Sequence, residues 1–399
     1  MKNLVALGYK KRKLILALIA LAIILRFIFL NLYNWQHGNT GYSGVQYLVD
    51  SFRYIEGAEA LLDGGSLDYK QQQFAGYIAL IVFAKITGAG VYIVVWLQIL
   101  MALLSAYFLY KLVLSFSGSR FAGFTASGFY LANPFITQWH LYIMTESLYT
   151  SMLIITVFLL YKALEKKTIR TYISAIISLL IILSIRPNAW VLLPLTLTFG
   201  IHAYLKRAWI KSLVSMFVTT LFVVIVTHLP FTNKAIENIG TEHIRMNQVF
   251  LNGEVIPNCP ELRVNMPVDN ALAGDNWKKS YLYILQNPLP CIKLAIKRVV
   301  TELLQINRSW LSVKYKLRLY LWLFPAYIFA LIGGWYFRKN KAVKIIFWVV
   351  IMHLMIIALT FADYEGRFLN YFLPLIYACT GCGVAIVINK ILKKQQSTG

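Results

Sequence analysis

Two acidic residues of this sequence lie where a carboxylate could act as a general base. Asp50 is in the run Tyr47-Leu-Val-Asp50-Ser-Phe-Arg53-Tyr54, at the start of a predicted amphipathic helix, and Glu146 lies where a short turn enters a predicted membrane span. A carboxylate between membrane and water is partly desolvated, which makes it a better proton acceptor. Each has a structural alternative, because polar residues at a helix start often cap the helix.

Two arginines could bind an anionic group, because a guanidinium donates paired hydrogen bonds to a phosphate. Arg186 precedes Pro187 between two predicted spans, and Arg367 lies just before the last predicted span. The alternative for Arg367 is a local ion pair with Asp363 or Glu365. No acidic residue is close to Arg186 in sequence, which favours a phosphate ligand there.

Further polar residues near these positions could orient a substrate. Arg53, Tyr54, Tyr77 and His140 are candidates for binding or positioning an acceptor, and Lys70 is a third candidate for a donor phosphate. Structural alternatives apply here too. A lone interfacial His is more often structural, and a Lys beside an apolar helix can simply extend its ammonium to the membrane surface.

The four cysteines are too few for a disulfide scaffold. Cys259 and Cys291 lie in one predicted outer segment and could form a disulfide if the compartment is oxidising. Cys379 and Cys382 form a C-x-x-C pair inside an apolar helix, where packing is the better interpretation without two further metal ligands. The sequence therefore predicts no metal and no cofactor.

The elements that position these residues are expected to be transmembrane helices. Of 399 residues, 59% are hydrophobic and 14% are charged, and the mean hydropathy is +0.62. A soluble domain is nearer half apolar and a quarter charged, so a soluble enzyme and a disordered chain are both excluded. Lys and Arg number 39 against 16 Asp and Glu, a net charge of +23. In a membrane protein such an excess orients helices rather than binding nucleic acid.

Long apolar stretches predict an all-α polytopic membrane protein with about ten spans of roughly 20 residues. The first span follows the basic run Lys10–Lys13 and is longer than a signal-peptide core, so we expect it to remain uncleaved. Residues 74–88 form a shorter apolar helix, predicted to lie on or dip into the outer surface. The predicted spans are 14–33, 90–114, 121–139, 145–164, 171–185, 188–205, 209–231, 319–337, 345–362 and 369–389.

The charges of the loops predict the orientation of the chain. With both termini in the cytoplasm, every short inner loop is basic, as the positive-inside rule requires. Glu165 is then the one inner acid, and the other fifteen of the sixteen acidic residues face outward. Asp50 and Glu146 both fall on the outer face.

Two outer segments are long enough to fold. The first, 34–89, contains the amphipathic stretch Asp50–Leu62, which is typical of a helix in the membrane interface. The second, 232–318, is predicted to form a small outer lobe, and its part 290–306 has apolar and basic residues at a spacing suited to lipid headgroups. The predicted divisions are a transmembrane catalytic module (1–231), the lobe (232–318) and C-terminal transmembrane helices (319–399).

In order and spacing, these features resemble the GT-C membrane glycosyltransferases that use polyprenyl-phosphate sugars. That group includes lipid A aminoarabinose transferases, protein O-mannosyltransferases and lipopolysaccharide-core transferases. The matching positions are Asp50, Tyr54, Ala58, Gly64 and Gly65, then Phe74-Ala-Gly-Tyr77 and Thr87-Gly88, Pro134, Glu146 with Leu148, Arg186-Pro187, Gln286-Asn-Pro288 with Ala295 and Arg298, and Arg367 with Pro374 and Gly381-Cys-Gly383.

The sequence departs from the family pattern in three places. The first outer loop lacks an Asp-x-Asp pair, which argues against the metal-dependent oligosaccharyltransferase branch. Both prolines of the turn before the short helix are absent. A Lys-Pro-Pro-Leu turn is not evident, and Lys70 followed by three glutamines is its loose counterpart.

The resemblance implies an inverting hexosyl- or pentosyltransferase in the bacterial cytoplasmic membrane, with its active site on the outer, periplasmic side. Arg186, Arg367 and Lys70 would bind the phosphate of a polyprenyl-phosphate sugar. Asp50 would deprotonate an acceptor hydroxyl, and Glu146 would position the acceptor or assist the base. The expected partners are this lipid-linked co-substrate, membrane lipids and an acceptor glycolipid, glycan or protein, without nucleic acid.

Other functions remain open. An O-antigen ligase or polymerase would use a diphosphate-linked glycan, with His243 and Arg245 in the large loop as candidates, although the acidic first loop argues against it. A secondary transporter or flippase would place polar groups at the membrane midplane in repeated halves, and no half-repeat is evident. A membrane assembly factor would need no acid at Asp50.

Overall fold

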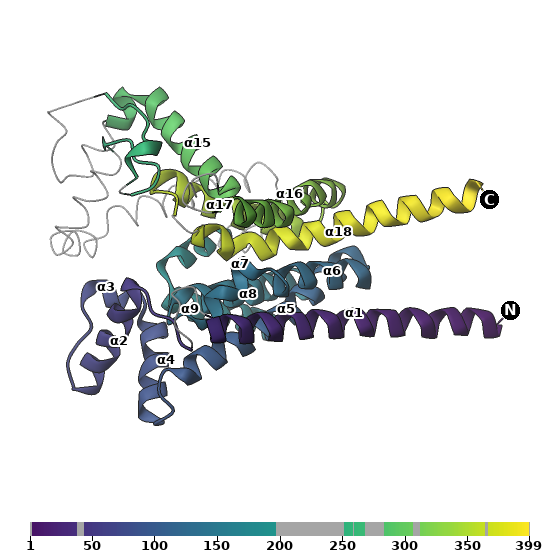
Figure 1. Cartoon of the computed structure of the whole chain (residues 1–399), viewed down its shortest axis with the longest axis horizontal. Coiled ribbons are helices and arrows are strands. Elements are labelled where there is room, and N and C mark those ends of the chain that lie inside the picture. The colour runs from purple at the N-terminus through teal and green to yellow at the C-terminus, as the bar shows by residue number, and fades with distance from the viewer. Residues whose placement is uncertain are drawn as a thin grey trace. The chain divides into compact units, whose positions relative to one another are not determined.

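A computed structural model of the chain describes residues 2–37, 44–196, 251–257, 259–267, 283–305, 312–363 and 366–398. These residues are mostly helical, and no β-strand occurs among them (Figure 1). The predicted all-α class is therefore confirmed. The predicted span 209–231 and the residues His243, Arg245 and Glu365 lie outside the described part of the chain.

Five helices in the described part of the chain are long and apolar enough to cross a membrane. They are α5 (Tyr92–Ser117), α8 (Thr145–Lys166), α16 (Val313–Tyr336), α17 (Lys341–Leu359) and α18 (Arg367–Thr398). Each overlaps one predicted span, as expected of a multi-pass membrane protein. The total of about ten spans and the orientation stay predictions.

Shorter and less regular elements also follow the sequence. Helix α1 (Lys2–His37) covers the first predicted span, and α9 (Ile169–Ile185) covers the fifth. The two predicted helices of the first loop appear as α2 (Val49–Leu62) and α4 (Ala75–Ile86), with the single turn α3 (Tyr69–Gln72) between them. The predicted span 188–205 begins as the 3₁₀ helix η2 (Pro187–Val191), and its part beyond residue 196 is outside the described residues.

The predicted span 121–139 is not one helix, which corrects the sequence interpretation. It divides into α6 (Arg120–Leu131), the single turn α7 (Pro134–Thr137) and the 3₁₀ helix η1 (Gln138–Leu141). Pro134 has no N–H with which to continue α6, and the Asn133 side chain accepts the Phe135 N–H at 2.9 Å to start the next turn. The chain therefore reaches Glu146 through a compact buried turn.

The described helices form two compact units. The first contains Met1–Ala189, Leu317–Phe347 and Asn370–Gly399. In it, α5 packs against α6 and α8, and α8 packs against α9, while α2 to α4 lie at one end of this bundle (Figure 1). The second unit contains Trp190–Lys316 and Trp348–Leu369.

Glycines allow α18 to pack closely within the first unit. A Cβ at Gly383 would overlap the carbonyl of Phe329 in α16, and a Cβ at Gly381 would overlap the carbonyl of Ala122 in α6. Small residues permit such backbone approach between membrane helices. The Gly-x-Gly of the last span thus has a packing function. Cys379 and Cys382 are buried on the same helix, as the packing interpretation expects.

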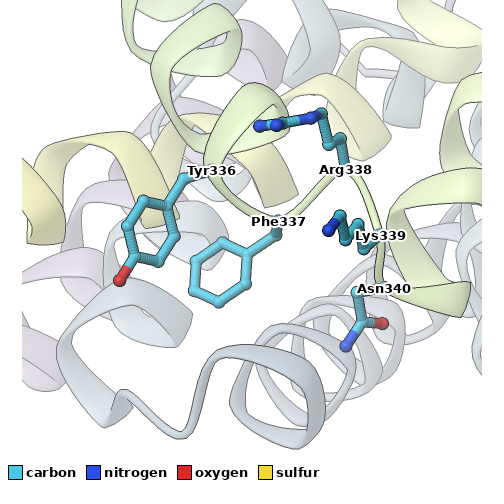
Figure 2. Close-up of a pocket in the computed structure, with 5 residues that line it drawn as sticks. All are labelled: Tyr336, Phe337, Arg338, Lys339 and Asn340. Atoms are coloured by element: carbon cyan, nitrogen blue, oxygen red, sulfur yellow. The ribbon is translucent and has the colours of Figure 1, made fainter.

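The turn between α16 and α17 forms an open pocket of about 540 Å³, lined by Tyr336, Phe337, Arg338, Lys339 and Asn340. Figure 2 shows the two aromatic rings on one side of this turn and Lys339 with Asn340 on the other. The Arg338 guanidinium lies over the Trp335 ring at 4.3 Å from its centroid. None of these residues is a candidate site residue, so the pocket is not the predicted active site.

The second unit contains α15 (Pro288–Leu304) and the short η3 (Pro260–Leu262). Leu289, Ile292 and Ile296 on α15 are 77%, 53% and 58% exposed. The opposite side of the helix is buried and includes charged residues. This exposed apolar stripe is compatible with contact with lipid, and the position of 290–306 on lipid headgroups stays a prediction.

The proposed disulfide between Cys259 and Cys291 is not formed in the structure, where both are buried thiols. Cys291 instead packs in a small apolar cluster with Tyr283 and Met266. Burial raises the pKa of the Cys291 thiol, which disfavours the reactive thiolate. Cys291 therefore serves packing here.

Candidate active site

The loops that carry Asp50 and Glu146 are joined by backbone hydrogen bonds. The Gln46 N–H donates to the Leu141 carbonyl at 3.0 Å, and the Ile143 N–H donates to the Gln46 carbonyl at 3.1 Å. This isolated parallel bridge precedes each acid by only a few residues. The segments that lead into α2 and α8 are thus hydrogen-bonded to each other, although Asp50 and Glu146 are distant in sequence.

Asp50 lies in the first turn of α2 but is not its N-cap. The cap position belongs to Leu48, whose N–H donates to the Ser51 hydroxyl at 2.9 Å. The Asp50 carboxylate is 3.3 Å from the Arg53 guanidinium, and the two side chains are 35% and 26% exposed. The capping alternative therefore does not explain this residue, and the carboxylate remains accessible to a substrate.

Tyr54 lies on the buried face of α2 and connects the two acids electrostatically. Burial raises the pKa of its phenol well above the ordinary value, and the nearby Glu146 carboxylate raises it further. The Arg186 guanidinium and a hydrogen bond with Thr145 lower the pKa, and Asp50 raises it. Tyr54 is therefore a neutral hydrogen-bonding group, and its surroundings include both predicted acids and one predicted arginine.

Arg186 is held by residues at the start of α8. Its Nη1 donates to the Glu146 Oε1 at 2.9 Å and to the Thr145 hydroxyl at 2.6 Å. The side chains of Arg186 and Glu146 are 13% and 2% exposed. The acid that is missing near Arg186 in sequence is therefore present in space, because α8 and α9 pack as neighbours.

Tyr371 of α18 completes this cluster within the first unit. Its hydroxyl donates to the Glu146 Oε1 at 3.3 Å, and its ring lies 4.7 Å from the Arg186 guanidinium. A ring face attracts a guanidinium through its quadrupole. The orientation of Arg186 is therefore fixed by an acid, a hydroxyl and a ring. Tyr371 was not predicted, because nothing in the sequence of the last span distinguishes it from other membrane tyrosines.

The buried amide of Gln98 links Tyr77 to the turn that precedes α8. The Gln98 Nε2 donates to the carbonyls of His140 and Tyr142 at 2.8 and 3.0 Å, and its Oε1 accepts from the Tyr77 hydroxyl at 3.0 Å. Tyr77 packs edge-on against Tyr54, with ring centroids 5.3 Å apart. Gln98 was also missed, although a single amide inside an apolar span was an available signal.

His140 is better explained as a structural residue than as an acid or base. It is 1% exposed, and its Nδ1 lies 2.6 Å from the Ser147 hydroxyl. Burial lowers the pKa of the imidazole to about 3, so the ring is neutral at physiological pH.

This shift predicts an acid-dependent loss of stability. Between the unfolded pKa of 6.5 and the folded value of about 3, the unfolded chain binds a proton that the folded chain does not. The free energy of unfolding therefore decreases as the pH is lowered through this window. The decrease is about 2 kcal/mol at about pH 5. Thermal unfolding of the purified protein should show that His140→Gln removes this part of the acid sensitivity. The exposed His37→Gln is the control, and equal acid sensitivity of wild type and His140→Gln would contradict the assignment.

The remaining candidates lie outside this cluster of contacts. Lys70 is half-buried in α3. Arg367 lies in the second unit, where its Nε donates to the Asp363 carboxylate at 3.0 Å. The local ion pair that was the alternative for Arg367 is therefore present. Within the described ranges, no group of three or more His, Cys, Asp or Glu side chains could hold a metal ion.

The helices and the buried arginine–acid pair define a multi-pass membrane protein with a polar cluster where α8 begins and α9 ends. Residues 74–231 match the family model described as dolichyl-phosphate-mannose-protein mannosyltransferase. The match includes Glu146 and Arg186 and begins after Asp50. A search of curated proteins finds no match to the chain. The match covers less than half of the chain and supports its resemblance to GT-C membrane glycosyltransferases.

Proposed function

We propose that the protein is an inverting glycosyltransferase that uses a polyprenyl-phosphate sugar. It transfers the sugar to a hydroxyl of an acceptor lipid, glycan or protein. The observation that carries this proposal is the backbone bridge that joins the segment before the accessible Asp50 carboxylate to the segment before the Glu146–Arg186 pair. The family match over 74–231 supports the class of reaction.

Asp50 acts as the general base in this proposal. Its carboxylate takes the proton of the acceptor hydroxyl while the oxygen attacks the anomeric carbon. The bond between that carbon and the phosphate oxygen breaks, and the polyprenyl phosphate leaves with the bonding electrons. Attack from the face opposite the leaving group inverts the anomeric centre. The 35% exposure of the Asp50 side chain allows an acceptor to approach it.

Arg186 binds the donor phosphate and stabilises the charge that grows on it during departure. Its contacts with Thr145, Glu146 and Tyr371 order the side chain before the donor arrives. Such preorganisation reduces the entropic cost of binding. Glu146 contacts Arg186 directly, so orienting this arginine is the role that its geometry favours over contact with the acceptor.

Two further phosphate ligands are proposed from the sequence. Arg367 and Lys70 stay candidates through the family motifs. The outer face of the bacterial cytoplasmic membrane is the proposed location, because the loop charges place Asp50 and Glu146 there.

A donor panel tests the proposed function. The purified protein in proteoliposomes is given one sugar on a polyprenyl monophosphate, on a polyprenyl diphosphate or on a nucleotide. We expect transfer from the monophosphate alone. Transfer from the diphosphate alone would favour a ligase or polymerase, and counterflow of lipid-linked sugar without transfer would favour a transporter.

A further inference from the structure

The second half of α15 carries two charged residues on its buried side. Arg298 and Glu302 are both 0% exposed. Burying a charged group is costly unless it is hydrogen-bonded or paired. The hydrogen-bond partners of Arg298 and Glu302 therefore show which segments α15 stabilises.

Glu302 binds both ends of the loop that leads into α18. Its Oε2 accepts the Asp363 N–H at 2.8 Å, and its Oε1 accepts the Leu369 N–H at 2.8 Å. The Leu369 N–H is one of the first N–H groups of α18, which have no partner inside the helix. One carboxylate thus closes the loop and stabilises the start of α18.

The end of α15 packs directly on the middle of this loop. Gln305 ends the helix in the left-handed region, at φ 52°, and its Nε2 donates to the Glu302 carbonyl at 2.6 Å. Gly366 also has a positive φ, 63°, and a Cβ there would overlap the Gln305 amide. Gly366 is therefore required both for backbone conformation and for space.

Arg298 holds the chain just before the loop. Its Nε and Nη2 donate to the Glu254 carbonyl at 3.1 and 2.9 Å, and its Nη1 donates to the Ala358 carbonyl at 3.2 Å. Burial lowers the pKa of Arg298 to about 10, so the side chain stays charged at neutral pH. Arg298 thus ties α15 both to Glu254 and to Ala358, and Ala358 precedes the segment that carries Arg367.

Asp363 in turn binds Arg367 through both of its carboxylate oxygens. Its Oδ1 lies 3.0 Å from the Arg367 Nε and 2.9 Å from the Nη2, and its Oδ2 accepts the Arg367 N–H at 3.1 Å. A continuous series of hydrogen bonds therefore runs from Glu302 through Asp363 to the Arg367 guanidinium.

We propose that Glu302 is a positioning residue that holds Asp363 and the start of α18 in place, so that Arg367 presents its guanidinium to the donor phosphate. This inference rests on the proposed phosphate role of Arg367. A substitution at Glu302 that removes one of its two acceptors weakens the restraint on Asp363 and Leu369. Arg367 itself is unchanged.

Steady-state kinetics of Glu302→Gln test the inference in the full-length protein. An amide can accept at one of the two positions only. We therefore expect the KM for the lipid-linked donor to rise about 10- to 100-fold, the range of a hydrogen bond to a charged group, with the acceptor KM unchanged. Hydrogen–deuterium exchange of the peptide that contains Asp363 and Leu369 should accelerate. The exposed Glu261→Gln in the same unit is the matched control, with no expected change.

A double-mutant cycle separates positioning from general stability. If Glu302 acts through Arg367, adding Glu302→Gln to Arg367→Ala causes no further rise in donor KM. Additive losses, or an unchanged donor KM in Glu302→Gln, would overturn the inference. An unchanged donor KM in Arg367→Ala would instead remove the phosphate role of Arg367, and the inference with it, while leaving the roles of Asp50 and Arg186 intact.

Gly366→Ala provides a second route if Glu302→Gln fails to fold. It displaces the same loop against Gln305 without placing a new group beside the buried carboxylate. We expect the same selective rise in donor KM, and a change in acceptor KM alone would contradict the proposal.

Discussion

Asp50→Asn should reduce kcat for sugar transfer by about 10²- to 10⁴-fold, because the amide cannot accept the proton of the acceptor hydroxyl. Donor binding should be nearly unchanged, since Asp50 has no proposed contact with the phosphate. The substitution keeps the side-chain volume, and the helix cap at Leu48 and Ser51 does not depend on it. The measurement is single-turnover transfer from a labelled lipid-linked donor.

Asp63→Asn is the matched control for this experiment. Asp63 is an exposed acid at the other end of α2, so its removal should leave transfer near the wild-type rate. Full activity of Asp50→Asn, with a correctly folded protein, would show that another group is the base. Equal losses in both variants would point to a general effect of charge in the first loop.

Arg186→Ala should lower kcat/KM for the donor by about 10²- to 10³-fold, the effect of removing one preorganised group that stabilises developing charge. The same substitution leaves Glu146 buried without its arginine. Breaking a buried ion pair in this way costs about 3–5 kcal/mol of stability. Donor affinity should therefore be measured together with thermal unfolding.

The double variant Glu146→Gln/Arg186→Gln separates the two effects. It removes both charges, so much of the stability should return while donor affinity stays low. Arg170→Ala is the matched control, because Arg170 is exposed at the opposite end of α9. Wild-type donor affinity in either Arg186 variant would contradict the phosphate assignment.

The transmembrane helices were predictable because their signal is local. Runs such as Tyr92–Ser117 and Lys341–Leu359 are too apolar and too long for other structures. The break between α6 and α7 was missed, because the run 121–139 is largely apolar and contains no charged residue. Asn133-Pro134 carried the needed signal, since proline cannot continue a helix.

The partners within the site were not predictable, because they are contacts between distant segments. Glu146 and Arg186 are 40 residues apart, and their ion pair requires α8 and α9 to pack side by side. Asp50 was proposed from its local position alone. Glu302 was missed because an acid on an amphipathic helix normally faces water, whereas α15 buries its polar side.

Release of polyprenyl monophosphate is the direct sign of the proposed transfer reaction. The purified protein in nanodiscs is incubated with a polyprenyl-phosphate sugar and an acceptor, and both lipid products are followed by mass spectrometry. The account predicts that free polyprenyl monophosphate and glycosylated acceptor appear in equal amounts, and that Asp50→Asn forms neither. A donor that stays intact with correctly folded wild-type protein and acceptor would contradict the proposed transfer.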